Sequence, residues 1–126
     1  MIDMVKMEVK GENLIIRLEG VEEIAAFKGS LEIPINCIER VVYFKDLDDT
    51  EKEQIHPRLR VGGTSIGEIL YGRFTTPLGL AFFATKKLER SVVIYVTRCS
   101  FPYKVVVVEV SDSEIVRELE EKLKRD

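Results

Sequence analysis

Hydrophobic and polar residues alternate along much of the chain, which is the pattern of β-strands that bury one face. In VKMEV at 5–9, the two valines and the methionine share one face, and LIIRL at 14–18 repeats the pattern. GEN at 11–13 separates these segments and favours a tight turn. The N-terminal part is therefore predicted to form a β-hairpin.

The next segments alternate less regularly. VEEIAAFKG at 21–29 predicts a short helix that ends at Gly29, because alanine and glutamate favour helix and glycine is its usual stop. SLEIPIN is predicted to be a strand at a sheet edge or a bulge, since Pro34 lacks a backbone N–H. IERVVYFK at 38–45 predicts another strand. The charged segment 46–56 predicts a surface loop, with or without one helical turn.

Four further strand-like runs follow, EILYGRF, GLAFFAT, RSVVIYVT and YKVVVVEV. TTPLG at 75–79 and KKLE at 86–89 are the turns predicted between the first three. VVVV at 105–108 is apolar on every side, which indicates a central strand or one covered on both faces.

The end of the chain predicts an amphipathic helix from about Asp112 to Lys124. Ser111 and Glu114 have the spacing of a capping box, with a hydrophobic staple on either side of them. The apolar stripe that should pack onto a sheet consists of Ile115, Val116, Leu119 and Leu123.

These elements predict a mainly β protein in a single domain over residues 1–126. Short turns without intervening long helices favour antiparallel sheets, and about eight strands need a sandwich or a barrel to bury two faces. The composition is that of a globular domain, with 45% hydrophobic and 33% charged residues.

Composition also suggests where the protein resides. No run is apolar enough to cross a membrane, and the N-terminus lacks the apolar core of a signal peptide. Cys37 and Cys99 are far apart and have no C-x-x-C spacing, so they are interpreted as two reduced, partly buried thiols. A cytoplasmic protein without a transmembrane segment is predicted.

Charge is distributed unevenly along the chain. The net charge is −3, but residues 56–104 hold eight lysines and arginines against two glutamates, which leaves −9 for the remainder. Such a basic segment suits an anionic headgroup, a phosphorylated ligand or an acidic partner, unless the cations only pair with the acidic half of the domain. The candidate binding residues are Arg58, Arg60, Gly62, Gly63, Thr64, Ser65, Arg73, Lys86, Lys87 and Arg90.

The glycines of VGGTSIGE do not form a phosphate-binding P-loop. The spacing and the lysine of that motif are absent, and a strand follows where a helix would be needed. Gly62, Gly63 and Gly67 are interpreted mainly as a structural corner with positive φ or a bulge, and secondarily as an anion site.

No catalytic or metal site emerges from the sequence. His56 is the only histidine and has no nucleophile fixed beside it. One histidine and two distant cysteines offer no metal-ligand spacing, and the acidic residues between Asp46 and Glu53 lack the order of a calcium loop. The chain is therefore predicted not to be an enzyme and to need no cofactor.

The segments SLEIPINCIERV, RVGGTSIGEILYGRF, LAFFAT, VVIYV and YKVVVVEVSD, with the final helix, resemble the bacterial pleckstrin-homology-like (PH-like) domains over residues 25–124. The resemblance implies a PH-like barrel of two roughly orthogonal antiparallel sheets capped by the C-terminal helix, without known catalysis. Members often carry proline after the isoleucine of the glycine segment, whereas Ile66 is followed here by Gly67.

Two function classes follow from these observations. The first is a non-catalytic binding or assembly module that recognises a protein partner, a second copy of itself or an anionic surface. The second is a small-molecule-binding or enzymatic domain with a pocket between sheet and helix. The overall negative charge and the absence of interleaved basic and aromatic residues argue against nucleic acid.

Overall fold

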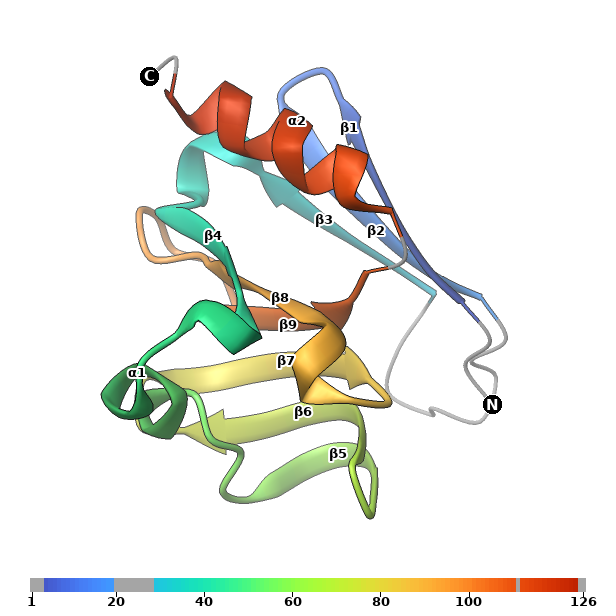
Figure 1. The fold of residues 1–126 in the computed structure, drawn as a ribbon, viewed down its shortest axis with the longest axis vertical. Coiled ribbons are helices and arrows are strands. Elements are labelled where there is room, and N and C mark those ends of the chain that lie inside the picture. Colours follow the sequence, from blue (N-terminus) through green and yellow to red (C-terminus); the bar gives the residue numbers. More distant parts are fainter. Residues whose placement is uncertain (1–3, 20–28, 111, 125–126) are drawn as a thin grey trace.

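The computed structural model describes residues 4–19, 29–110 and 112–124 of the chain (Figure 1). In this part of the chain there are nine strands, two α-helices and three short 3-10 helices. They are β1 Met4–Lys10, β2 Asn13–Glu19, β3 Ser30–Pro34, η1 Ile35–Cys37, β4 Arg40–Tyr43, η2 Phe44–Asp46, α1 Asp49–Gln54, β5 Arg60–Ile66, β6 Ile69–Thr76, β7 Gly79–Thr85, η3 Leu88–Arg90, β8 Ser91–Tyr95, β9 Val105–Glu109 and α2 Ser113–Lys124.

The smaller sheet contains three antiparallel strands in the order β1-β2-β3. β1 and β2 form the predicted hairpin, closed by a two-residue turn in which Gly11 has a φ of +63°. β3 is an outer strand, as Pro34 predicted. The helix predicted at 21–29 lies, apart from its last residue, outside the described residues.

The larger sheet contains six strands in the order β4-β8-β9-β7-β6-β5. The VVVV run lies in β9 between two other strands, and all four valines are fully buried, so the prediction of a central strand is confirmed. β7 and β9 pair in parallel, however, which corrects the prediction of purely antiparallel sheets. The reason is that β9 inserts between β7 and β8, which themselves run in opposite directions after a short turn.

Both faces of the larger sheet are covered. One face packs against the smaller sheet and α2, through residues such as Phe82 and Leu119. The other face carries Phe83 and packs against Leu47 and Ile55, which flank α1. Phe82 and Phe83 therefore serve opposite cores, as neighbouring residues of a strand must.

Helix α2 lies beside the smaller sheet and contacts β1, β4 and η1 (Figure 1). Ile115, Val116 and Leu119 are buried, and Leu123 packs against the same core, so the predicted stripe is confirmed. Ser111 of the predicted capping box lies outside the described residues. The carboxylate of Asp112 accepts a hydrogen bond from the backbone N–H of Glu114, which caps the first turn.

The charged segment before β5 contains α1, so of the two predicted forms, a surface loop with or without a helical turn, the form with a helix is the one observed. Its start is a capping box: the carboxylate of Asp48 accepts from the N–H of Glu51, and the carboxylate of Glu51 accepts from the N–H of Asp48. Arg40 on β4 forms an ion pair with Glu51 and lies 4.6 Å from the ring centroid of Tyr95. This pair attaches α1 to the larger sheet.

The strands of the two sheets run obliquely to each other in Figure 1. Neither sheet closes on itself, so the predicted closed barrel is wrong. Within the described residues, β1 and β3 are the outer strands of the smaller sheet, and β4 and β5 are the outer strands of the larger sheet. The architecture is a pair of open sheets with a C-terminal helix.

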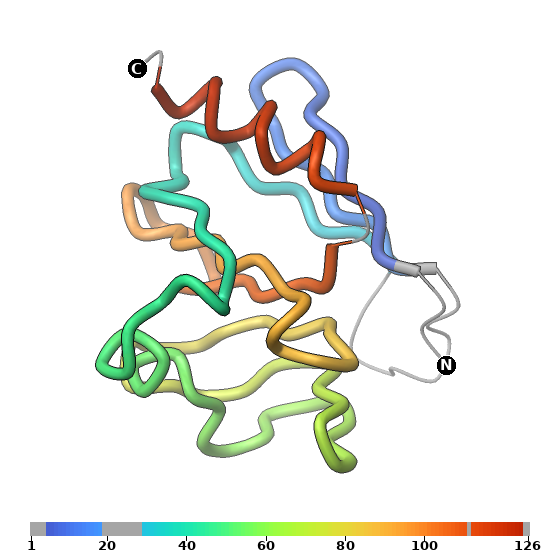
Figure 2. The backbone as a smooth tube through the Cα atoms, in the orientation of Figure 1, coloured from blue at the N-terminus to red at the C-terminus, as the bar shows by residue number. Residues whose placement is uncertain are grey.

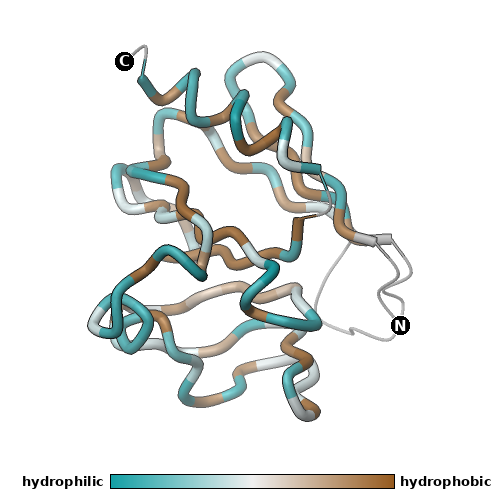
Figure 3. Tube along the Cα trace, in the orientation of Figure 1, coloured by the Kyte–Doolittle hydropathy of each residue, from teal (hydrophilic) through white to brown (hydrophobic). Residues whose placement is uncertain are grey.

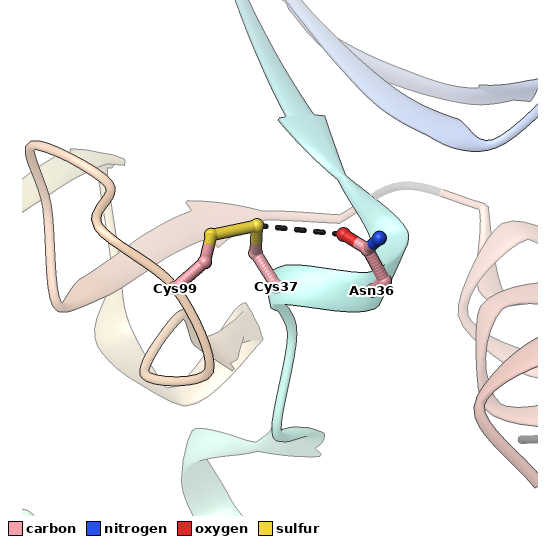
Figure 4. The surroundings of a disulfide bond; sticks show 3 residues. All are labelled: Asn36, Cys37 and Cys99. Atoms are coloured by element: carbon pink, nitrogen blue, oxygen red, sulfur yellow. Dashed lines mark hydrogen bonds between the residues drawn. A yellow bond between two sulfur atoms is a disulfide. The ribbon is translucent and has the colours of Figure 1, made fainter.

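Cys37 and Cys99 form a disulfide, with their Cα atoms 5.1 Å apart (Figure 4). The prediction of two reduced thiols is therefore wrong. The backbone N–H of Arg98 donates to the carbonyl of Cys37, which holds the loop after β8 against η1. The cytoplasmic location rested partly on reduced cysteines and stays a prediction. Within the described residues, no helix is long and apolar enough to cross a membrane.

Candidate functional site

Strand β5 is a free outer strand of the larger sheet. It lies at the bottom of the molecule in Figures 1 and 2, at the end away from α2. β6 pairs with one side of β5, and no described strand pairs with the other. The opposite outer strand, β4, contacts α2. An outer strand presents unpaired backbone N–H and C=O groups, so β5 offers a template for another strand.

Three apolar side chains follow this edge. Leu59 is 70% exposed, Val61 is 51% exposed and Ile66 is 68% exposed. In Figure 3 the outermost strand of this sheet carries hydrophobic colour toward its ends. Exposed apolar residues on a long outer strand are a recognised mark of an interaction surface or an aggregation site.

Glycines shape the hairpin that carries this edge. Gly63 lies opposite Gly72, with φ angles of +120° and +127°, and a Cβ on either would overlap a carbonyl oxygen of the other strand. A bulge lies between Arg60 and Gly62. The hairpin ends in a two-residue turn in which Gly67 has a φ of +59°. The interpretation of these glycines as a structural corner is confirmed, although the segment forms a strand.

The two ends of β5 carry opposite charges. Arg60 begins the strand, and Glu68 lies in the turn after it; both are exposed, and neither has an ion pair within the described residues. Arg58, just before the strand, differs because it forms a 2.6 Å ion pair with Glu53. Arg60 and Glu68 are therefore available to a partner that pairs along the strand.

All the candidate binding residues except Arg73 fall into two groups. Most of them lie on β5 or immediately before it, at Arg58, Arg60, Gly62, Gly63, Thr64 and Ser65. Lys86, Lys87 and Arg90 lie in the β7–β8 connection. From the strand register, Arg60 lies about 20 Å from Lys86, two strands across and five residues along. This separation exceeds the Debye length of about 8 Å in physiological salt, so the structure does not bring these cations together.

The β7–β8 connection is held by buried hydroxyl groups. The Ser91 hydroxyl donates to the Thr85 hydroxyl at 2.7 Å, and the Thr85 hydroxyl donates to the Lys87 carbonyl at 2.9 Å. The carboxylate of Glu109 accepts from the backbone N–H of Lys86 at 2.8 Å. The backbone that carries the two lysines and Arg90 is therefore fixed, while the side chains of Lys86 and Arg90 are exposed.

Arg73 is a third case. It lies on β6 opposite Gly62, is half-buried, and its Nε has no hydrogen-bond partner within the described residues. Burial raises the pKa of the Tyr103 phenol, and the nearby charge of Arg73 opposes that rise. Arg73 thus faces the interior near Tyr103 more than the open edge.

Two cavities bear on the alternative of a small-molecule or enzymatic domain. One, of about 340 Å³, lies between β1 and the start of α2, and a 2.9 Å ion pair between Glu8 and Arg17 forms part of its lining. The other, of about 480 Å³, is lined by His56, Ser65 and Glu68 among others. Within the described residues no hydrogen bond joins the His56 ring to Ser65.

The described residues contain no group of three or more histidine, cysteine, aspartate or glutamate side chains arranged to hold a metal ion. The prediction that the chain is not an enzyme stays a prediction.

No family model matches this chain, and comparisons with curated proteins and with solved structures return no significant match. The resemblance to bacterial PH-like domains therefore rests on the sequence segments alone.

Sequence reasoning missed Leu59, Val61 and Ile66 as members of the site. Their signal was present in RLRV, where arginines alternate with apolar residues, and in IGEI, where a glycine turn separates two isoleucines. The three glycines obscured it, because they are typical of loops and carry no side chain that would continue the alternation.

Proposed function

We propose that this chain is a non-catalytic, PH-like binding or assembly module, and that the β5 edge receives an extended strand from a protein partner. The observation that carries the proposal is the seven-residue outer strand β5, which has exposed apolar side chains on an unpaired edge. In strand addition, backbone hydrogen bonds supply affinity and alternate side chains supply specificity.

The arrangement of the sheet favours this mode. An outer strand that only closed the sheet would be expected to be short or to carry lysine, proline or inward charges that discourage pairing. β5 has its bulge and Arg60 only at its start; from Gly62 to Ile66 its register is regular, and Thr64 and Ile66 are residue types that favour sheets. The PH-like part of the proposal is supported in outline by two sheets followed by a C-terminal helix.

Selection of displayed random peptides, followed by NMR mapping, tests the proposal. We expect the selected peptides to be extended and rich in β-branched residues, and to protect backbone amides of β5 from exchange. Val61→Lys should abolish their binding, because a lysine on the edge opposes strand addition. Leu78→Lys is the matched control, since Leu78 is also exposed but lies in the β6–β7 turn.

Other outcomes would overturn the proposal. Peptides that bind the Val61→Lys variant as tightly as the parent, or that map to the cavity between β1 and α2, would favour the pocket-based alternative. Flotation with anionic vesicles, abolished by Lys86→Ala with Lys87→Ala and unchanged by Val61→Lys, would favour an anionic surface or phosphorylated ligand instead.

A further inference from the structure

We propose that the strand added to β5 is β5 of a second copy of this chain, paired antiparallel about a two-fold axis at Thr64. This inference rests on the proposed function and names its partner. It follows from the placement of backbone groups, apolar side chains and charges along the one edge.

The backbone fixes which groups are available. Ile66 and Ile69 flank a two-residue turn and therefore form a hydrogen-bonded pair. Because such pairs alternate along an antiparallel ladder, Ser65 and Gly63 occupy the positions that do not bond to β6. A two-fold axis at Thr64 sets Gly63 of each copy opposite Ser65 of the other. The backbone N–H and C=O groups of Gly63 and Ser65 that do not bond to β6 then face those of the second copy and can form hydrogen bonds with them.

The side chains are self-complementary in the same register. Thr64 faces Thr64 of the second copy, and threonine pairs are favourable across antiparallel strands. Arg60 lies beside the turn that carries Glu68 of the second copy, and this contact occurs twice by symmetry. A parallel arrangement would place arginine beside arginine. Charge complementarity therefore selects the antiparallel pairing.

The apolar residues of the edge support the same partner. With the axis at Thr64, Val61 lies opposite Gly67 and Ile66 lies opposite Gly62 of the second copy, so each apolar side chain packs over a position that has no side chain. A two-fold interface uses the same patch on both subunits, which requires a patch that is complementary to itself. β5 meets this requirement because each of its apolar residues lies opposite a glycine and because its two ends carry opposite charges.

Sedimentation equilibrium over a range of concentrations tests the dimer. The parent is expected to approach twice the 14.4 kDa mass of one chain as concentration rises. Arg60→Glu and Glu68→Arg should each weaken dimerisation about tenfold, since each creates two like-charge contacts. The double variant should restore it. Arg90→Glu is the control, because Arg90 lies in the β7–β8 connection, and thermal scans establish that each variant is folded.

Oxidative cross-linking provides a second measurement. Thr64→Cys should form a covalent dimer on mild oxidation, because directly opposed residues have Cβ atoms close enough for a disulfide. Leu78→Cys should not.

A parent that remains monomeric at every concentration would overturn this inference, while peptides selected onto β5 would leave the proposed function standing. If both charge-reversal variants dimerise as tightly as the parent, and Thr64→Cys does not form a covalent dimer, the register and the two-fold pairing are overturned.

Discussion

At the residue scale, glycines decide the shape of the candidate edge. Gly63 and Gly72 lie opposite each other where two backbones approach too closely for any side chain. Gly67 differs, because a Cβ there would meet nothing within 4 Å and only its positive φ requires glycine. The same residue type therefore serves two physical purposes within one hairpin.

Gly63→Ala is expected to disrupt the β5–β6 pairing. The added methyl group would overlap the carbonyl oxygen of Tyr71, so the strands must separate locally. Gly67→Ala should cost only about 1–2 kcal/mol, from its left-handed backbone. Urea unfolding gives the two stabilities, and amide exchange in β5 reports local separation. Equal losses for the two variants, with unchanged β5 exchange, would contradict the assigned crowding.

Leu119 is the most deeply buried of the residues that pack α2 onto the core. It is fully buried, so Leu119→Ala should lower the free energy of unfolding by about 2–5 kcal/mol. Leu78→Ala is the matched control, because Leu78 is 37% exposed and should lose far less. Chemical denaturation measures both. A Leu119→Ala variant as stable as the parent would show that α2 does not pack as described.

At the element scale, the alternating segments and the final helix were predictable from the sequence. Their apolar residues, from Leu14 in β2 to Leu119 in α2, face a core that a local pattern can specify. The partners of each strand were not predictable in this way. The VVVV run contains no local signal for its parallel pairing with β7. Pairing between segments that are distant in the sequence depends on how all the strands of the sheet pack together.

The candidate site was predicted only in part. The glycine corner and the cations next to it were identified, because turn chemistry is local. Their separation from Lys86 depends on the sheet register and had no local signal. The disulfide likewise joins two cysteines 62 residues apart, and only the folded chain brings them together.

Helix α1 is expected to lose stability in acid. The pKa of Glu51 lies below its ordinary value, first because its carboxylate accepts the N–H of Asp48 and second because of Arg40. A lowered folded-state pKa contributes stability above the ordinary value of 4.5, and this contribution is lost as pH falls through the folded value. NMR titration of the Glu51 side chain should therefore give a midpoint below 4.5.

Two variants refine this test. Arg40→Ala should raise the Glu51 midpoint only partly, because the larger contribution from Asp48 remains. Glu51→Gln should remove the Glu51 midpoint from the pH dependence of the Asp48 backbone N–H signal, because that N–H donates to the Glu51 carboxylate. A parent midpoint at the ordinary value would contradict the capping arrangement.

At the scale of the whole molecule, the disulfide lies just beyond the end of the β4–β8 pairing, because Cys37 precedes β4 and Cys99 follows β8. Cys37 follows the smaller sheet, and Cys99 lies in the loop between β8 and β9 of the larger one. The cross-link therefore ties the junction between the sheets to the loop that precedes the central strand (Figure 4). It restricts the unfolded chain over 62 residues.

Reduction of this disulfide should lower the free energy of unfolding by about 4 kcal/mol, from the loss of loop-closure entropy in the unfolded chain. Denaturation with and without a reducing agent measures the difference. The Cys37→Ser, Cys99→Ser double variant should be insensitive to the agent. Equal unfolding midpoints for the oxidised and reduced parent would contradict the cross-link.

The position of β9 constrains the order in which the protein can assemble during synthesis. This central strand is the last to be made, yet it lies between β8 on one side and β7 on the other. Until the ribosome has released residues 105–109, the β4–β8 pair and the β5–β7 meander remain two separate fragments with open inner edges. A nascent chain that stalls before this point would expose the apolar faces of both fragments, which makes it a substrate for chaperones that bind hydrophobic segments.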